Sequence, residues 1–181
     1  MSVTFEEVDP AAAFDPGLRS DLLDTWVAVT DAGGSVGFTA PAPVDAVAAT
    51  LDASLARVAA GEDALGILRD GREAVGMGLL VTGPGALTRH WRTVLRVMVH
   101  PDHQGKGAGL ALMRGLHQLA QRLGLEQLQL TVRGGEGLER FYERLGYVVV
   151  GRHPGAVRVG PGDDRDEIML VLGLRDGGAA R

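Results

Sequence analysis

The sequence predicts an α/β fold of the α+β kind, in which helices cover both faces of a mixed, mostly antiparallel central sheet of about seven strands. Apolar residues recur at helical spacing in some segments and at every second position in others, in the order β-α-α-β-β-β-α-β-α-β-β. The fourth and fifth predicted strands are joined through a helix and can pair only in parallel. Strands that are joined by short hairpins pair antiparallel.

The elements form a single domain, 1–181, with a core over about residues 3–174 and a tail, 175–181, that is expected to be frayed. The glycine- and proline-rich segments 32–43 and 153–166 are expected to be loops, and Asp70-Gly71 is a hairpin signal. In order, the predicted elements are strand 3–8, helices 18–30 and 44–60, strands 64–69, 73–81 and 90–99, helix 107–123, strand 127–132, helix 138–145, and strands 147–151 and 168–174.

In two segments, the spacing of the residues predicts which side chains lie on the same side of the strand or helix. Alternation in the fourth strand places the following residues on one side of the sheet: Trp91, Thr93, Leu95, Val97 and Val99. Helical spacing in segment 107–123 directs its apolar residues inward, namely Leu112, Met113, Leu116, Leu119, Ala120 and Leu123. These inward side chains are expected to build much of the core.

The composition limits the classes of partner and compartment. The formal net charge of −5 argues against nucleic acid, which calls for a basic surface, and leaves room for cationic amines. The chain has no cysteine, and hence no disulfide or thiolate nucleophile. No apolar run approaches the ~18 residues of a membrane span, and residues 1–9 are unlike a signal peptide. We therefore expect a cytoplasmic monomer or homodimer without a membrane partner.

The most informative stretch is a glycine-rich turn, Gln104-Gly105-Lys106-Gly107-Ala108-Gly109, between a predicted strand and a predicted amphipathic helix. The first N–H groups of a helix have no intrahelical partner and the helix dipole adds partial positive charge, so such a turn is a physical anion site. Glycines let the backbone approach a phosphate closely. The P-loop and dinucleotide-binding patterns are absent, because neither Ser nor Thr follows Lys106 and the glycine spacing differs.

The turn reads Gln-x-x-Gly-x-Gly at Gln104, Gly107 and Gly109, and Val99-His100-Pro101 precedes it. This pattern resembles the acetyl-CoA loop of the GNAT superfamily of N-acetyltransferases. A second stretch resembles the helix of that family that carries Phe-Tyr and ends at Leu-Gly-Phe/Tyr: Leu138-Glu139-Arg140-Phe141-Tyr142-Glu143-Arg144-Leu145-Gly146-Tyr147. The resemblance covers about residues 3–174 and implies an N-acetyltransferase with acetyl-CoA as its co-substrate.

The resemblance also implies roles for single residues. The fourth and fifth strands would splay apart and hold the pantetheine arm of acetyl-CoA on backbone groups of Val97, Met98 and Val99. Tyr142 stands where the family places its general acid, and a phenol with a pKa near ~10 can protonate a leaving thiolate. No metal is expected, since the two histidines of His100-x-x-His103 lack a zinc-binding context. The pyrophosphate would lie on N–H groups of Gln104, Gly105, Lys106, Gly107, Ala108, Gly109 and Leu110.

Within the family, segments 33–38 (Gly-Gly-Ser-Val-Gly-Phe) and 152–155 (Arg-His-Pro-Gly) resemble tabtoxin-resistance-type acetyltransferases. That subgroup has acidic residues where Thr93 and Thr131 stand here, a departure that argues against a tabtoxin-like substrate. The fourth strand offers no carboxylate, so the general base stays open. Loops 32–43 and 153–166 are expected to wall the acceptor, a small-molecule primary amine. Five acids either hold its ammonium group or form a solvated face: Asp31, Asp163, Asp164, Asp166 and Glu167.

Two other functions stay open. Gly33-Gly34-Ser35-Val36-Gly37 matches the G-x-S-x-G nucleophile elbow of a serine hydrolase. That elbow follows a strand and opens a helix, whereas Ser35 follows a helical pattern and precedes a proline-rich segment. A non-catalytic domain that binds or senses CoA is the other alternative. An assay that observes acetyl transfer, ester hydrolysis or binding without turnover distinguishes the transferase, the hydrolase and the CoA-binding domain.

Overall fold

The computed structural model describes residues 3–174, which contain one sheet of seven strands. The strands are β1 (Thr4–Glu7), β2 (Ala64–Asp70), β3 (Glu73–Thr82), β4 (Trp91–Val99), β5 (Gln127–Arg133), β6 (Val148–Gly160) and β7 (Asp163–Gly173). The helices are α1 (Pro16–Asp31), α2 (Val44–Ala59), α3 (Ala108–Arg122) and α4 (Leu138–Glu143), with short 3-10 turns between elements. The strand order is β1-β2-β3-β4-β5-β7-β6, and only β4 and β5 pair in parallel. The predicted fold class is confirmed.

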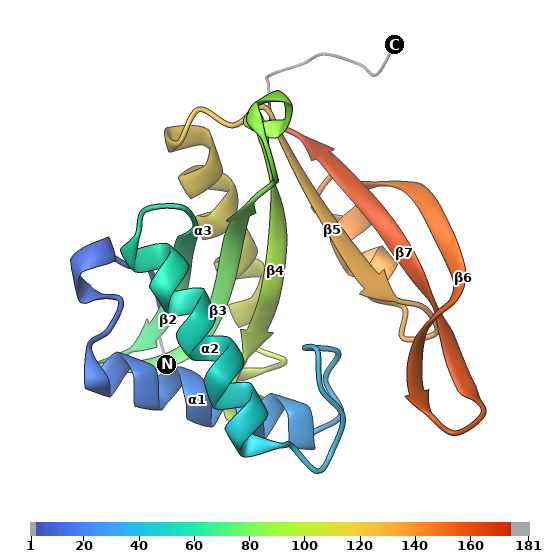
Figure 1. Ribbon diagram of the computed structural model, residues 1–181, viewed down its shortest axis with the longest axis horizontal. Helices are drawn as coiled ribbons and strands as arrows, with labels where there is room; N and C mark the ends of the chain where they lie inside the picture. Colours follow the sequence, from blue (N-terminus) through green and yellow to red (C-terminus); the bar gives the residue numbers. More distant parts are fainter. Residues whose placement is uncertain (1–2, 175–181) are drawn as a thin grey trace.

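Helices cover both faces of the sheet (Figure 1), and a hydrophobic core lies under the helices of each face. Helices α1 and α2 pack on one face, where Leu22 and Trp26 are fully buried. Helices α3 and α4 pack on the other face. Leu116 of α3 fits closely against β2 and β3, because Gly66 and Gly78 leave room for its side chain. The sheet is therefore a rigid wall with a helical layer on each side.

The sheet opens between β4 and β5. The two strands pair over only three residues each, Trp91–Thr93 with Gln127–Gln129. Beyond these residues the strands separate (Figure 1), while β5 stays paired with β7 along its whole length. The predicted splay is confirmed. Within residues 3–174, the β5-facing edge of β4 from Val94 to Val99 has no strand partner.

A β-bulge interrupts β4 near this opening. Arg96 and Val97 together stand opposite a single residue of β3. Arg96 has a φ of 56°, in the left-handed region that residues other than glycine rarely adopt. The extra residue shifts the alternation, so Leu95 is 38% exposed while Val97 packs against the α3 core. The predicted shared side is therefore wrong for the full set Trp91, Thr93, Leu95, Val97 and Val99.

The prediction of a loop over 153–166 is also wrong, because this segment is the β6–β7 hairpin. β6 is an edge strand. Proline has no N–H to donate to a neighbouring strand, and an edge strand tolerates Pro154 because it has a neighbour on one side only. The register shifts between His153 and Val157, which accommodates Pro154 and Gly155. The turn is Pro161-Gly162, and Gly162 has a φ of 74°. Glycine and proline here mark a bulge and a tight turn.

The inward face predicted for segment 107–123 is right for all but its last residue. Leu112, Met113, Leu116, Leu119 and Ala120 are fully buried. Leu123 is 42% exposed because it caps the C-terminus of α3, just before Gly124 turns the chain away. Helices in the part of the chain that the structure describes are too short or too polar to span a bilayer. The predicted tail, 175–181, lies outside the described residues.

Truncating Leu116 tests this packing against a matched leucine on the same helix. Leu116→Ala removes fully buried atoms from a closely packed site and is expected to cost about 2–5 kcal/mol of unfolding free energy. Leu123→Ala removes the same atoms at a partly exposed position and is expected to cost no more than about 0.5 kcal/mol. Urea denaturation followed by circular dichroism measures both, and equal losses would contradict the described helix orientation.

Candidate active site

The opening between β4 and β5 is the mouth of a cavity with a volume of about 1090 Å³. Its walls come from the α1–α2 loop, β4, the start of α3, β5, α4 and the β6–β7 hairpin. Of the residues that were expected to bind the donor, eight line it: Val97, Met98, Val99, Gln104, Gly105, Gly107, Gly109 and Leu110. Tyr142 lines it as well. One cavity thus joins the glycine-rich turn, the free edge of β4 and the predicted general acid.

The glycine-rich turn presents bare backbone to the cavity. Gly105 and Gly107 have φ values of 73° and 83°, and a Cβ on either would project into open space. Gly107 is the N-cap of α3 and supplies no capping side chain. The uncapped N–H groups at the start of α3 therefore point toward a site that suits an anion.

Three residues of the turn have structural contacts of their own. The Gln104 side chain donates from Nε2 to the Val99 carbonyl at 2.8 Å, and its backbone N–H donates to Pro101 at 3.1 Å. Gln104 therefore fastens the turn to the end of β4, and its N–H is already occupied. Lys106 and Ala108 do not line the cavity, since Lys106 Nζ donates to the Asp102 carbonyl and Ala108 is buried in the core.

Tyr142 of α4 reaches the cavity from the α3 side of the sheet. It is 9% exposed, and its ring packs edge-on against Phe141 and Tyr147, with centroids 5.1 and 5.6 Å away. Burial raises the pKa of Tyr142 to about 12, so the phenol keeps its proton well above neutral pH. Tyr147 is turned away from the cavity, and its hydroxyl lies 3.2 Å from His117 Nε2.

Comparison with known proteins identifies the family. The model of the acetyltransferase (GNAT) family matches residues 35–147, more than half of the chain. The chain belongs to the GNAT acetyltransferase family. The match includes the free edge of β4, the glycine-rich turn and Tyr142.

Solved structures of GNAT acetyltransferases share the fold along nearly their whole length. The yncA protein of Salmonella typhimurium, solved with acetyl-CoA, has 19% identity and a TM-score of 0.74, covering 100% of this chain and 99% of that one. An aminoglycoside 6'-N-acetyltransferase with coenzyme A has 17% identity and a TM-score of 0.74, covering 97% and 99%. A ribosomal-protein-alanine N-acetyltransferase from Brucella melitensis has 14% identity and a TM-score of 0.73, covering 94% and 99%. At these identities the likeness shows the fold alone.

In this GNAT protein the α1–α2 loop is held down by Arg96. The Val36 carbonyl accepts hydrogen bonds from Trp26 Nε1 at 3.1 Å and from Arg96 Nη1 at 3.0 Å. The guanidinium also lies 5.1 Å from the Trp26 ring centroid, and Gly37 lets it pass close to the loop backbone. Burial lowers the pKa of Arg96, whose hydrogen bonds and ring contacts within residues 3–174 include no carboxylate.

A bridge of polar side chains crosses the cavity from the α1–α2 loop to the end of β5 and the turn after it. Ser35 Oγ of the α1–α2 loop donates to Glu136 Oε2 at 2.6 Å, and Arg133 Nε donates to Glu136 Oε1 at 2.6 Å. Arg133 Nη2 also donates to the Gly33 carbonyl at 3.3 Å. Sequence reasoning missed this bridge, because its ends lie about one hundred positions apart and carry no local pattern. Ser35, the candidate hydrolase nucleophile, is bonded here to a carboxylate in a loop.

The acids expected around the acceptor are distributed differently from the prediction. Only Glu167 lines the cavity. Thr131 also lines it but Thr93 does not, and none of the five histidines does. No group of three or more metal-binding side chains occurs within residues 3–174. The other four acids have partners elsewhere: Asp31 accepts from Ala42 N–H, Asp163 pairs with Arg165, Asp164 with Arg158, and Asp166 with Arg152.

Proposed function

We propose that this protein transfers an acetyl group from acetyl-CoA to the primary amine of a small-molecule acceptor, by direct attack in a ternary complex. The observation that carries the proposal is the opening between β4 and β5, which ends at a bare glycine turn and contains Tyr142. The acetyl-CoA and coenzyme A in two solved GNAT relatives support the choice of donor.

The residues of the opening fit this donor. The pyrophosphate binds to the uncapped N–H groups between Gly105 and Leu110, and the positive φ values of Gly105 and Gly107 keep the backbone in reach. The pantetheine arm lies beside β4, whose free edge at Val97 and Val99 offers backbone groups as a neighbouring strand would. This binding mode needs no metal ion.

Acetyl-CoA supplies an activated thioester, so a nitrogen–carbon bond forms as the carbon–sulfur bond breaks. The N–H of Val97, at the bulge, donates to the thioester oxygen as negative charge develops there. Tyr142 donates its proton to the departing sulfur and recovers one from solvent. Arg96 favours the neutral form of the attacking amine, because a nearby positive charge lowers the pKa of an ammonium group. The amine proton leaves through water.

The part of the cavity under the α1–α2 loop, where the acceptor would bind, suits a small, cationic or zwitterionic amine. The α1–α2 loop and its bridge to Glu136 enclose the site, and the net charge of the chain is −5. The segments that resemble tabtoxin-resistance-type enzymes, 33–38 and 152–155, agree with a small-molecule acceptor. Binding of CoA without turnover and hydrolysis at Ser35 are the alternatives that an activity assay must separate.

Thiol release from acetyl-CoA across a panel of acceptors tests the function. We expect release with small primary amines, at a rate that rises with pH toward the pKa of the acceptor, because the cavity offers no histidine to take the proton. Simple esters should not be hydrolysed, and Ser35→Ala should retain acetyl transfer. Activity confined to alcohols or to ribosomal peptides would overturn the acceptor class, and binding without any release would overturn catalysis.

Replacing Gly107 tests the donor site. Gly107→Val places a side chain where the pyrophosphate binds and is expected to weaken acetyl-CoA binding more than about tenfold. Gly124→Val is the control, because Gly124 stands at the other end of α3 with a similar φ of 72° and equally open surroundings, but outside the cavity. Isothermal titration calorimetry compares the two. Equal affinities would remove the turn from the donor site.

Removing single hydroxyl groups tests the general acid. Tyr142→Phe is expected to lower kcat about 10²-fold or more while the KM for acetyl-CoA stays close to that of the unmodified protein. Tyr147→Phe removes a hydroxyl from the same aromatic cluster but from outside the cavity, so its kcat should change little. Because the pKa of Tyr142 is about 12, its deprotonation should not limit the rate below about pH 11. Equal rates in both variants would make Tyr142 a packing residue.

A further inference from the structure

Two charged side chains of the cavity have no oppositely charged partner within residues 3–174, the cation Arg96 and the carboxylate Glu167. Five charged residues line it: Arg96, Arg133, Glu136, Arg158 and Glu167. Arg133 pairs with Glu136, and Arg158 pairs with Asp164 outside the cavity. Glu167 is partly buried, and its side-chain carboxylate has no hydrogen-bond or ion-pair partner within residues 3–174. It is a carboxylate that faces the cavity and is open to a ligand.

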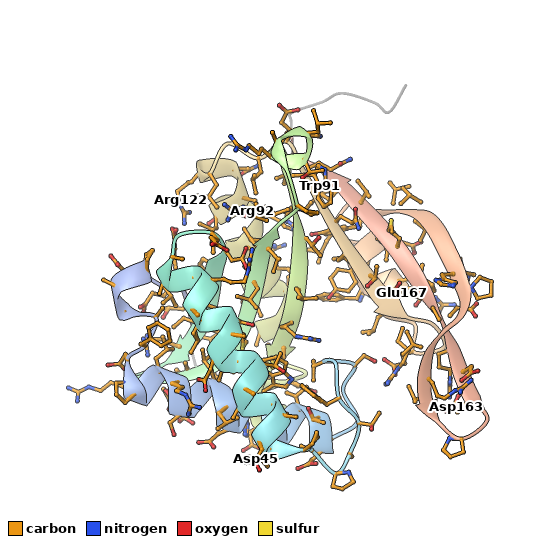
Figure 2. All side chains as sticks on the ribbon, viewed as in Figure 1. Asp45, Trp91, Arg92, Arg122, Asp163 and Glu167 are labelled. Atoms are coloured by element: carbon orange, nitrogen blue, oxygen red, sulfur yellow. The ribbon has the colours of Figure 1, made fainter. Side chains whose placement is uncertain are left out.

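Its position on β7 is set by strand pairing. Glu167 stands directly opposite Arg133 of β5 and opposite His153 of β6, and paired residues of neighbouring strands share a face. The Arg133 guanidinium is directed to Glu136 and to the Gly33 carbonyl instead. Figure 2 shows Glu167 part-way along β7 and Asp163 near the tip of the same hairpin. The Arg133 guanidinium is thus engaged in the bridge and is not available to neutralise Glu167.

Glu167 lies at about the same position along the strand direction as the bulge in β4. Thr93 pairs with Gln129, and counting four residues along each strand reaches Val97 on β4 and Arg133 on β5. Arg133 and its neighbour Glu167 therefore stand at about the level of the bulge. A donor arm beside β4 would have β5 between it and β7, so the backbone of Glu167 would lie at least two strand spacings from the arm, on the order of 10 Å.

This distance decides what Glu167 can do. A general base must come within about 3.2 Å of the proton that it takes, and Glu167 stands on the far side of β5 from a donor arm beside β4. A carboxylate at this distance suits a second positive group on the acceptor. Arg96, on the β4 side, disfavours positive charge on the attacking nitrogen, so the two ends of the acceptor site favour different charge states.

We propose that Glu167 binds a second cationic group of the acceptor, which makes the acceptor a small molecule with at least two basic nitrogens. This inference rests on the proposed function for the identity of the attacking amine. The first nitrogen, neutral, lies near the bulge of β4. The second, an ammonium group several bonds away, forms a charged hydrogen bond with the Glu167 carboxylate. Discrimination between diamines and monoamines then depends on this one side chain.

The test compares putrescine and spermidine with butylamine, a monoamine of matched chain length to putrescine. Each is titrated by calorimetry into the full chain saturated with coenzyme A, and acetylation is assayed separately with acetyl-CoA. The unmodified protein is expected to bind at least one polyamine about tenfold more tightly than butylamine. Glu167→Gln should abolish that advantage and leave butylamine binding unchanged. Asp163→Asn, which removes the same charge near the hairpin tip outside the cavity, should keep the advantage.

The two readouts separate this inference from the proposed function. A polyamine advantage in binding that depends on Glu167, without acetylation of any amine, would retain the cation site and overturn the transferase. Acetylation of amines without a polyamine advantage, or with an advantage that survives Glu167→Gln, would overturn the cation site and retain the transferase. Equal losses in Glu167→Gln and Asp163→Asn would reduce the effect to overall charge and also overturn the site.

Discussion

The candidate site depends on one constraint, the interruption of pairing between β4 and β5 after three residues. A continuous sheet would satisfy the backbone groups of Val97 and Val99 internally and leave no room for a ligand. Because the strands separate, β4 keeps a free polar edge inside the cavity, and β5 relies on β7 for its own hydrogen bonds. The antiparallel β5–β7 pairing therefore keeps the opening stable without closing it.

The bulge at Arg96 acts together with this opening. It places two residues of β4 opposite one of β3 and directs the Arg96 side chain toward Trp26 and Val36, while Val97 turns to the other face. The positive φ of Arg96 costs backbone energy for a residue with a side chain. The hydrogen bond to Val36 and the contact with Trp26 compensate part of that cost. They also hold the α1–α2 loop over the cavity, so strand geometry and acceptor wall are linked through a single arginine.

The parts of the structure that the sequence predicts are those whose cause is local. Helical spacing predicts the buried face of α3, because this pattern lies within one element. The glycine-rich turn is visible for the same reason. Leu123 is an exception, since helical spacing continues past the residue where α3 ends. The hairpin over 153–166 was missed because Pro154 and Gly155 are tolerated only through its place at the sheet edge.

The charges of the site show why composition alone could not define it. The net charge of −5 suggests an acidic binding surface, yet most acids of the β6–β7 hairpin are neutralised by arginines on the same hairpin. Such exposed pairs contribute little stability, but they cancel the field that a cationic ligand would meet. Glu167 differs because the arginine opposite it, on β5, is engaged by Glu136 in the turn that follows β5. Whether a carboxylate is available to a ligand is therefore decided by the other partners of the cations beside it, which net charge does not report.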